Sequence, residues 1–143
     1  MRSIDLRLLA RLGAAAADPY RPLLAQIVIT RRCNLACGYC YEYDHVSPPI
    51  PRETLLERFD HLARLRAVFV TLNGGEPLTH PDVVQLVADL RDRGAVPMIN
   101  TNAFLLTADL VRRLGDAARR YEAARGLPMA MRCAMRRRLT STT

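Results

Sequence analysis

The sequence predicts an α/β fold with a parallel sheet, built from about three strand–loop–helix units. Short, nearly continuous apolar runs at residues 23–30, 67–72 and 96–100 are typical of buried strands. Each run is followed by a loop and then by a segment with helical periodicity. Such alternation favours parallel strands joined by crossover helices. The loops that follow the strands then meet at the carboxyl edge of the sheet, where binding sites are built.

The first unit is preceded by an amphipathic helix. Residues 1–17 interrupt their apolar positions with charges, unlike the continuous apolar stretch of a signal peptide. Residues 23–30 are apolar enough for a strand buried on both faces. A helix is predicted over residues 53–66, because its leucines and Phe59 fall on one stripe.

The second and third units are marked by their loops and caps. The loop Asn73-Gly74-Gly75-Glu76-Pro77 follows the second strand. Thr79 is the expected N-cap of the next helix, and Gly94 ends that helix. Pro97 weakens the third strand. Thr107 is expected to cap a short helix that runs through Leu114 and stops at Gly115.

The pattern stops after Gly115, and no fourth strand follows. All 21 basic residues are arginine, and residues 116–143 hold seven of them against two acids. We therefore predict an N-terminal helix and lead-in at residues 1–21, a partial core domain at residues 22–115, and a helical or disordered arginine-rich tail at residues 116–143. The loss of periodicity leads to the hypothesis that the chain is a truncated or frame-shifted fragment.

The composition also limits the kinds of binding partner that the sequence predicts. The basic tail lacks the aromatic interleaving or motif of a nucleic-acid site, so no nucleic acid is predicted. No apolar run approaches the length of a membrane span, so no membrane is predicted. The free thiols favour a reducing, cytoplasmic compartment.

Three cysteines, Cys33, Cys37 and Cys40, form a C-x3-C-x2-C motif in the loop after the first strand. Three thiolates within eight residues indicate a soft metal: zinc, copper(I) or iron–sulfur. Zinc would need a fourth ligand, for which His45 is the nearest candidate. An iron–sulfur cluster with three protein ligands would keep one iron open for chemistry. By itself, the cysteine motif leaves both alternatives open.

The other loops favour the cluster. The cysteine motif carries an aromatic residue, Tyr39, directly before its last cysteine; Gly-Gly-Glu-Pro follows the second strand and Thr-Asn the third. With these motifs in this order, residues 22–115 resemble the first part of the core domain of radical S-adenosylmethionine (radical SAM) enzymes. The resemblance implies a partial (β/α) barrel, with about three of the units of a (β/α)6 barrel.

The resemblance also implies a function. Cys33, Cys37 and Cys40 would ligate three irons of a [4Fe–4S] cluster, and S-adenosylmethionine would bind the fourth. Reductive cleavage would give a 5′-deoxyadenosyl radical that abstracts hydrogen from an unknown substrate, with a reductant such as flavodoxin or ferredoxin. The cofactor-binding residues implied are Tyr39, Gly74, Gly75, Glu76, Pro77, Thr101 and Asn102.

Some residues depart from the family or have structural alternatives. Ala103 stands where the family often has glycine. Glu76 can cap the segment after it instead of binding an ammonium group, and Thr101 and Asn102 are common turn formers. Because the later barrel units are missing, a catalytically inactive half-barrel and a Cys3His zinc module remain alternatives.

Overall fold

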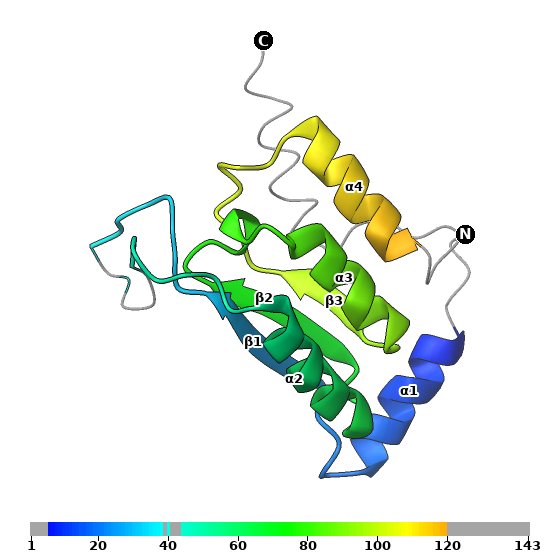
Figure 1. Ribbon diagram of the computed structural model, residues 1–143. Helices are drawn as coiled ribbons and strands as arrows, with labels where there is room; N and C mark the ends of the chain where they lie inside the picture. The colour runs from blue at the N-terminus through cyan, green and yellow to red at the C-terminus, as the bar shows by residue number, and fades with distance from the viewer. Residues whose placement is uncertain (1–5, 39, 41–43, 120–143) are drawn as a thin grey trace.

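The protein forms a three-stranded parallel sheet in the order β1-β2-β3, which confirms the predicted α/β class. The computed structural model describes residues 6–38, 40 and 44–119 (Figure 1). The strands are β1 (Leu24–Thr30), β2 (Phe69–Gly74) and β3 (Val96–Ile99). The helices are α1 (Leu6–Ala17), α2 (Arg52–Arg64), the 3-10 turn η1 (Pro77–Thr79), α3 (Val83–Asp92) and α4 (Ala108–Arg119).

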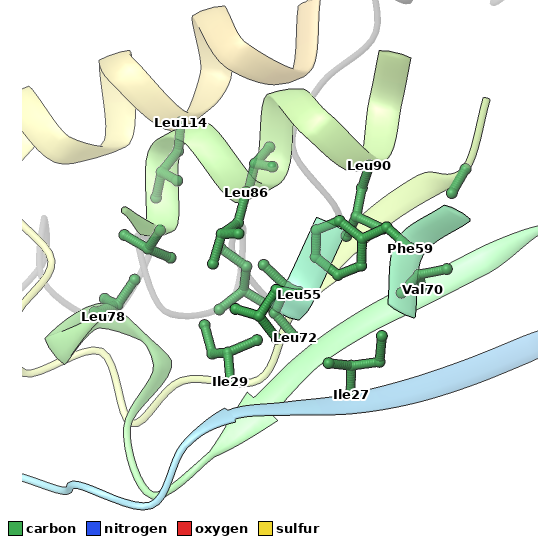
Figure 2. Close-up of a cluster of buried hydrophobic side chains, with 14 of the residues drawn as sticks. Ile27, Ile29, Leu55, Phe59, Val70, Leu72, Leu78, Leu86, Leu90 and Leu114 are labelled. Carbon is green, nitrogen blue, oxygen red and sulfur yellow. The ribbon is translucent and has the colours of Figure 1, made fainter. Parts of the chain in front are cut away.

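The core lies between one face of the sheet and helices α2 and α3, with α4 packed on α3 (Figures 1 and 2). The strands contribute alternate aliphatic side chains and the helices contribute one stripe each, as their periodicity predicts. Burying these side chains is the main source of stability. The buried members labelled in Figure 2 are Ile27, Ile29, Leu55, Phe59, Val70, Leu72, Leu78, Leu86, Leu90 and Leu114.

Strand β1 corrects one expectation, because only one of its faces is buried. Ile27 and Ile29 face the core, whereas Leu24 is 51% exposed and Val28 is 38% exposed. The helices α2 and α3 both cover the same face of the sheet, so the other face of β1 is open within the described residues (Figure 1). On this open face the Asn73 side chain donates a hydrogen bond to Gln26, 2.8 Å long.

The start of α3 also differs from the prediction. Thr79 does not cap α3, because residues 77–79 form the separate turn η1 and α3 begins only at Val83, with Asp82 at the N-cap position. The Thr79 hydroxyl instead donates to the carbonyl of Glu76 at 2.8 Å. Gly94 follows α3 with φ +81°, so its predicted stop is confirmed.

Helix α4 begins as predicted but continues further. The Thr107 hydroxyl accepts a hydrogen bond from the Leu110 amide at 3.1 Å, which confirms the cap. The helix then passes through Gly115, beyond the expected end at Leu114, and is described as far as Arg119. Glycine costs only about 1 kcal/mol inside a helix. Packing of Ala117 and Ala118 on the core offsets that cost.

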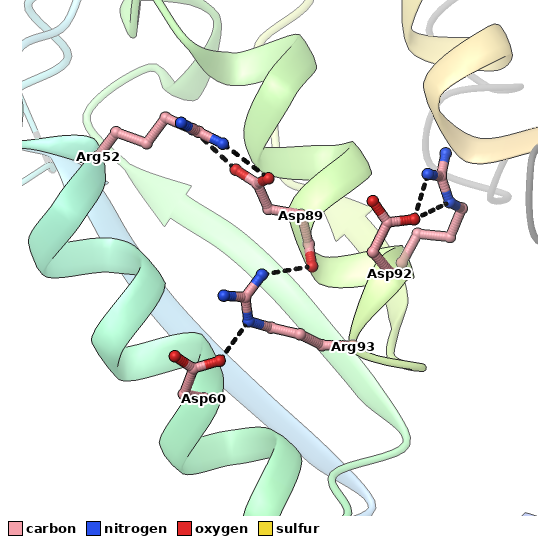
Figure 3. Close-up of polar contacts among 6 residues, drawn as sticks. Arg52, Asp60, Asp89, Asp92 and Arg93 are labelled. Carbon is pink, nitrogen blue, oxygen red and sulfur yellow. Dashed lines mark hydrogen bonds and ion pairs between the residues drawn. The ribbon is translucent and has the colours of Figure 1, made fainter.

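Charged residues connect α2 to α3 (Figure 3). The Arg52 guanidinium donates two hydrogen bonds to Asp89, at 2.9 and 2.8 Å, and Asp89 is 7% exposed. One turn along, Arg93 pairs with Asp60 at 2.6 Å, which lowers the pKa of Asp60 below its usual value. A two-donor pair of this kind fixes the geometry between helices as well as adding energy. These two ion pairs hold α2 and α3 side by side on the same face of the sheet.

Candidate functional site

Three loops extend from the carboxyl ends of the strands, and the structure brings them together. The cysteine loop (residues 31–44) follows β1, the glycine loop (residues 74–77) ends β2, and the Thr-Asn loop (residues 100–103) follows β3. Their proximity was predicted from the parallel strand order alone. Hydrogen bonds between the loops, described below, make them one structural unit.

The cysteine loop is closed at its base. The Asp44 amide donates to the carbonyl of Arg31 at 2.8 Å, and the Cys33 amide donates to the carbonyl of Asp44 at 3.1 Å. The hydroxyl and amide of Ser47, together with the amide of Val46 and the Arg31 side chain, lower the pKa of Asp44 to about 2. Asp44 therefore keeps its charge through the neutral range. Sequence reasoning missed Asp44, although an aspartate three residues before a serine is a common loop-closing pattern.

The three cysteines all belong to this closed loop. Each is half-buried and none forms a disulfide. The Cys40 amide donates to the carbonyl of Cys37 at 3.0 Å, and the Leu35 amide points at the Cys33 sulfur at 3.4 Å. Within the described residues, no three His, Cys, Asp or Glu side chains are grouped as for a metal ion. The metal-ligating role of the cysteines thus stays a prediction, and Tyr39 lies outside the described residues.

Gly74 and Gly75 allow two segments of backbone to lie very close together. The neighbouring segment is the protein's own backbone at residues 30–32, not a ligand. A Cβ on Gly74 would stand 2.0 Å from the Thr30 carbonyl oxygen, and one on Gly75 would stand 2.5 Å from that of Arg31. The Gly75 amide donates to Thr30 at 3.0 Å, and the Glu76 amide donates to Arg32 at 2.9 Å. The glycines therefore let the end of β2 lie directly against the start of the cysteine loop.

Glu76 is fully buried and is the centre of the loop contacts. One carboxylate oxygen accepts from the Leu78 amide and from the Thr101 hydroxyl, both at 2.8 Å. The other accepts from the Asn102 amide at 2.8 Å. A carboxylate offers about four acceptor positions. Glu76 thus caps η1, as one alternative expected, and also anchors the Thr-Asn loop, with about one acceptor position left.

The Thr-Asn loop joins the cysteine loop directly. The Asn102 side-chain amide donates to the Asn34 side-chain oxygen at 2.9 Å, across 68 residues of sequence. Thr101 is half-buried and its hydroxyl is bound to Glu76, whereas Asn102 is exposed and its side chain reaches the cysteine loop. Sequence reasoning did not single out Asn34. Its position directly after Cys33 was the available signal.

Ala103 has a backbone conformation that favours glycine, which explains why the family often has glycine at this position. Its φ is +68°, in the left-handed region that costs a residue with a Cβ roughly 1–2 kcal/mol. Its amide nonetheless donates to the Thr101 hydroxyl at 2.9 Å. The chain keeps the turn despite the strain.

Replacing Ala103 with glycine should therefore stabilise the protein, by about 1 kcal/mol, because glycine adopts this φ without strain. The free energy of unfolding in urea measures the change. Ala88→Gly, inside α3, is the matched control and should destabilise by about 1 kcal/mol. Destabilisation by Ala103→Gly would mean that the alanine side chain contributes more through packing than its backbone strain costs.

The histidines have different surroundings. His45 lies beside the cysteine loop, with Nδ1 3.1 Å from the Cys33 carbonyl oxygen. His80 is buried, with its two ring nitrogens beside the Ile50 carbonyl and the Asp82 amide. His61 is exposed on α2 beside Arg64. His45 is therefore the histidine nearest to the cysteines in the described chain, although it forms no metal group with them.

Comparison with known proteins assigns the family. The model of the Radical SAM superfamily matches residues 27–123, which include all three cysteines and all three loops. The chain belongs to the radical SAM superfamily. A PqqA peptide cyclase of Bradyrhizobium diazoefficiens is 33% identical over 99 residues, which are 67% of this chain and 26% of the cyclase. An AdoMet-dependent heme synthase of Methanosarcina barkeri is 34% identical over 99 residues, 67% of this chain and 28% of the synthase.

The fold agrees with this family. BtrN in complex with AdoMet and 2-DOIA superimposes with a TM-score of 0.56 at 21% identity, covering 68% of this chain and 42% of BtrN. Streptococcus suis SuiB bound to S-adenosylmethionine gives 0.54 at 19% identity, covering 80% of this chain and 27% of SuiB. The open parallel sheet therefore matches the partial barrel of radical SAM proteins. The chain spans about a quarter of the length of the curated relatives it matches.

Among the described residues, no helix has the length and apolarity that a bilayer crossing needs.

Proposed function

We propose that this chain carries the cofactor-binding part of a radical SAM enzyme. The supporting observation is the placement of the three free cysteines in a closed loop at the carboxyl edge, beside the loops that Glu76 holds together. Three thiols with no disulfide among them form a soft donor set, which suits iron–sulfur chemistry. The donor set therefore fits a [4Fe–4S] cluster, with Cys33, Cys37 and Cys40 as its ligands.

When bound, the cluster supplies the electron that cleaves S-adenosylmethionine to methionine and a 5′-deoxyadenosyl radical, which takes hydrogen from a substrate. The residues of this chain would position the reactants. Asp44 keeps the cysteine loop closed, and Glu76 holds the Thr-Asn loop next to it. The Asn34–Asn102 hydrogen bond aligns the edges of the two loops. We propose Tyr39, Gly74, Gly75, Pro77, Thr101 and Asn102 as the surroundings of S-adenosylmethionine.

The domain division is also a proposal: a lead-in at residues 1–21, a core at residues 22–115 and a separate tail at residues 116–143. Helix α4 crosses the last boundary by one turn, through Arg119. Substrate and reductant, with flavodoxin or ferredoxin as the expected kind, belong to the whole enzyme that such a core serves.

Anaerobic reconstitution with iron and sulfide, followed by metal analysis, tests the proposed function. About four irons per chain, together with 5′-deoxyadenosine on addition of S-adenosylmethionine and a strong reductant, would support it. A single zinc that is lost in His45→Ala would identify the Cys3His alternative instead. Four irons without any 5′-deoxyadenosine would identify a cluster-binding chain that is inactive by itself.

Glu76→Ala should weaken the binding of S-adenosylmethionine by roughly 10- to 150-fold while leaving the iron content unchanged, since a hydrogen bond to a charged group contributes about 1.5–3 kcal/mol. The substitution removes the acceptor for an ammonium group and frees the Thr-Asn loop. It also leaves three donors, of which the Leu78 amide is buried, without their acceptor, so the free energy of unfolding should fall by about 3 kcal/mol. Calorimetric titration of the reconstituted variant and urea unfolding measure the two effects.

Glu57→Ala, on the exposed surface of α2, is the matched control and should change neither quantity. Glu76→Gln separates the two roles of Glu76, because the amide keeps the size of the side chain but not its charge. An unchanged dissociation constant in a folded Glu76→Ala variant would show that Glu76 acts only as a cap and an anchor.

A further inference from the structure

An arginine-lined cavity of about 280 Å³ lies at the opposite end of the sheet from the cysteine loop. Three of its lining residues precede the strands: Arg21 before β1, Ala67 before β2 and Gly94 before β3. Helix α1 and the end of α2 form the rest of the wall. The guanidinium groups come from Arg11, Arg21, Arg66 and Arg93, and no acidic residue lines the cavity in the described part of the chain.

Neighbouring groups position three of these arginines. The Arg21 Nε donates to the carbonyl of Arg66 at 3.0 Å, and an Arg11 Nη donates to the carbonyl of Ala67 at 3.2 Å. Arg93 is held by Asp60 and by the carbonyl of Asp89 (Figure 3). A guanidinium has five N–H donors. The hydrogen bonds of Arg21 and Arg93 described above therefore use only part of their donors, which leaves further donors for a ligand.

Arg66 is different, because its side chain is not held in place. Its φ of +57° belongs to the turn that ends α2, in which the Arg66 amide donates to the Ala63 carbonyl at 2.9 Å and the Ala67 amide donates to the Leu62 carbonyl at 3.0 Å. Its side chain is exposed at the cavity, and it has no hydrogen-bond or ion-pair partner among residues 6–38, 40 and 44–119. The five N–H donors of this guanidinium are therefore open to a ligand, beside three arginines that are already positioned at the same cavity.

We propose that this cavity binds the phosphate group of a small anionic ligand. A phosphate carries nearly two negative charges at neutral pH and three acceptor oxygens, which match several converging guanidinium groups. The planar arginine fork binds phosphate through paired hydrogen bonds, and four such forks exceed what one carboxylate can use. The ligand would join α1 to the α2–β2 turn. This site is independent of the cluster and of S-adenosylmethionine.

Titration calorimetry of the full chain tests the site, with inorganic phosphate and pyrophosphate as probes and chloride holding the ionic strength constant. Saturable binding is expected, together with a rise in the melting temperature. Arg66→Gln should weaken the binding about fivefold, the effect of losing one exposed charge contact. Its fold is not at risk, since the side chain has no partner in the described residues and the backbone carbonyl stays.

Arg58→Gln, an exposed arginine of α2 away from the cavity, makes the same charge change and should leave binding unaltered. Equal losses in the two variants would overturn the site in favour of unspecific charge attraction, as would citrate binding as tightly as pyrophosphate. Absence of saturable binding would also overturn it. ADP separates the sources: affinity equal to that of pyrophosphate assigns the site to the phosphates alone, and tighter binding assigns it to a nucleotide.

Discussion

Cys37→Ala is expected to reduce the iron content of the reconstituted chain from about four atoms to background. A cluster with three protein thiolates has no spare ligand, so the loss of one cannot be replaced from the same loop. Cys33→Ala and Cys40→Ala should have the same effect. Iron and sulfide analysis, with the visible absorption of the cluster, measures the result.

The fourth cysteine provides the matched control, since Cys133 lies far from the motif in sequence. Cys133→Ala should keep the full iron content. If it lowers iron as much as Cys37→Ala does, the ligand set is wrong. Unfolding curves of all four apo variants separate loss of the cluster from loss of the fold, because the half-buried cysteines contribute little packing.

Gly74→Ala is expected to give the largest loss of stability among single-atom changes in this chain, about 4 kcal/mol. The new methyl group would stand 2.0 Å from the Thr30 carbonyl oxygen, so β1 and β2 must separate at their paired ends. Overpacking of this kind costs about 1–3 kcal/mol, and the residue must also leave φ +146° or bear the strain. Urea unfolding of the apo protein measures the loss.

Gly13→Ala makes the same chemical change where a Cβ would meet nothing within 4 Å. Gly13 lies inside α1, so the substitution should stabilise the protein by about 1 kcal/mol. A Gly74→Ala variant as stable as the parent would show that the end of β2 relaxes away from the cysteine loop. Loss of iron binding by a folded Gly74→Ala variant would show that the strand end positions the cysteines.

The fold class was predictable because each unit carries its own signal. Apolar runs indicated the strands and periodic stripes indicated the helices, and the parallel order followed from their alternation. The predictions were wrong where contacts between residues distant in sequence determine the burial of a strand or the length of a helix. β1 carries large apolar side chains on both faces, yet of these only Ile27 and Ile29 are buried, because both crossover helices pack on that side. Helix α4 runs past Gly115 because Ala117 and Ala118 pack on the core.

The sequence by itself determined the motifs, their order along the chain and therefore the edge at which they meet. Only the tertiary structure decided what each group contacts. The Gly74–Gly75 pair packs against the protein's own backbone, and Glu76 joins the glycine loop to the Thr-Asn loop. The physical reason is that periodicity and capping act within a few residues. The hydrogen bond between Asn34 and Asn102, at a sequence separation of 68 residues, depends instead on how the intervening chain folds.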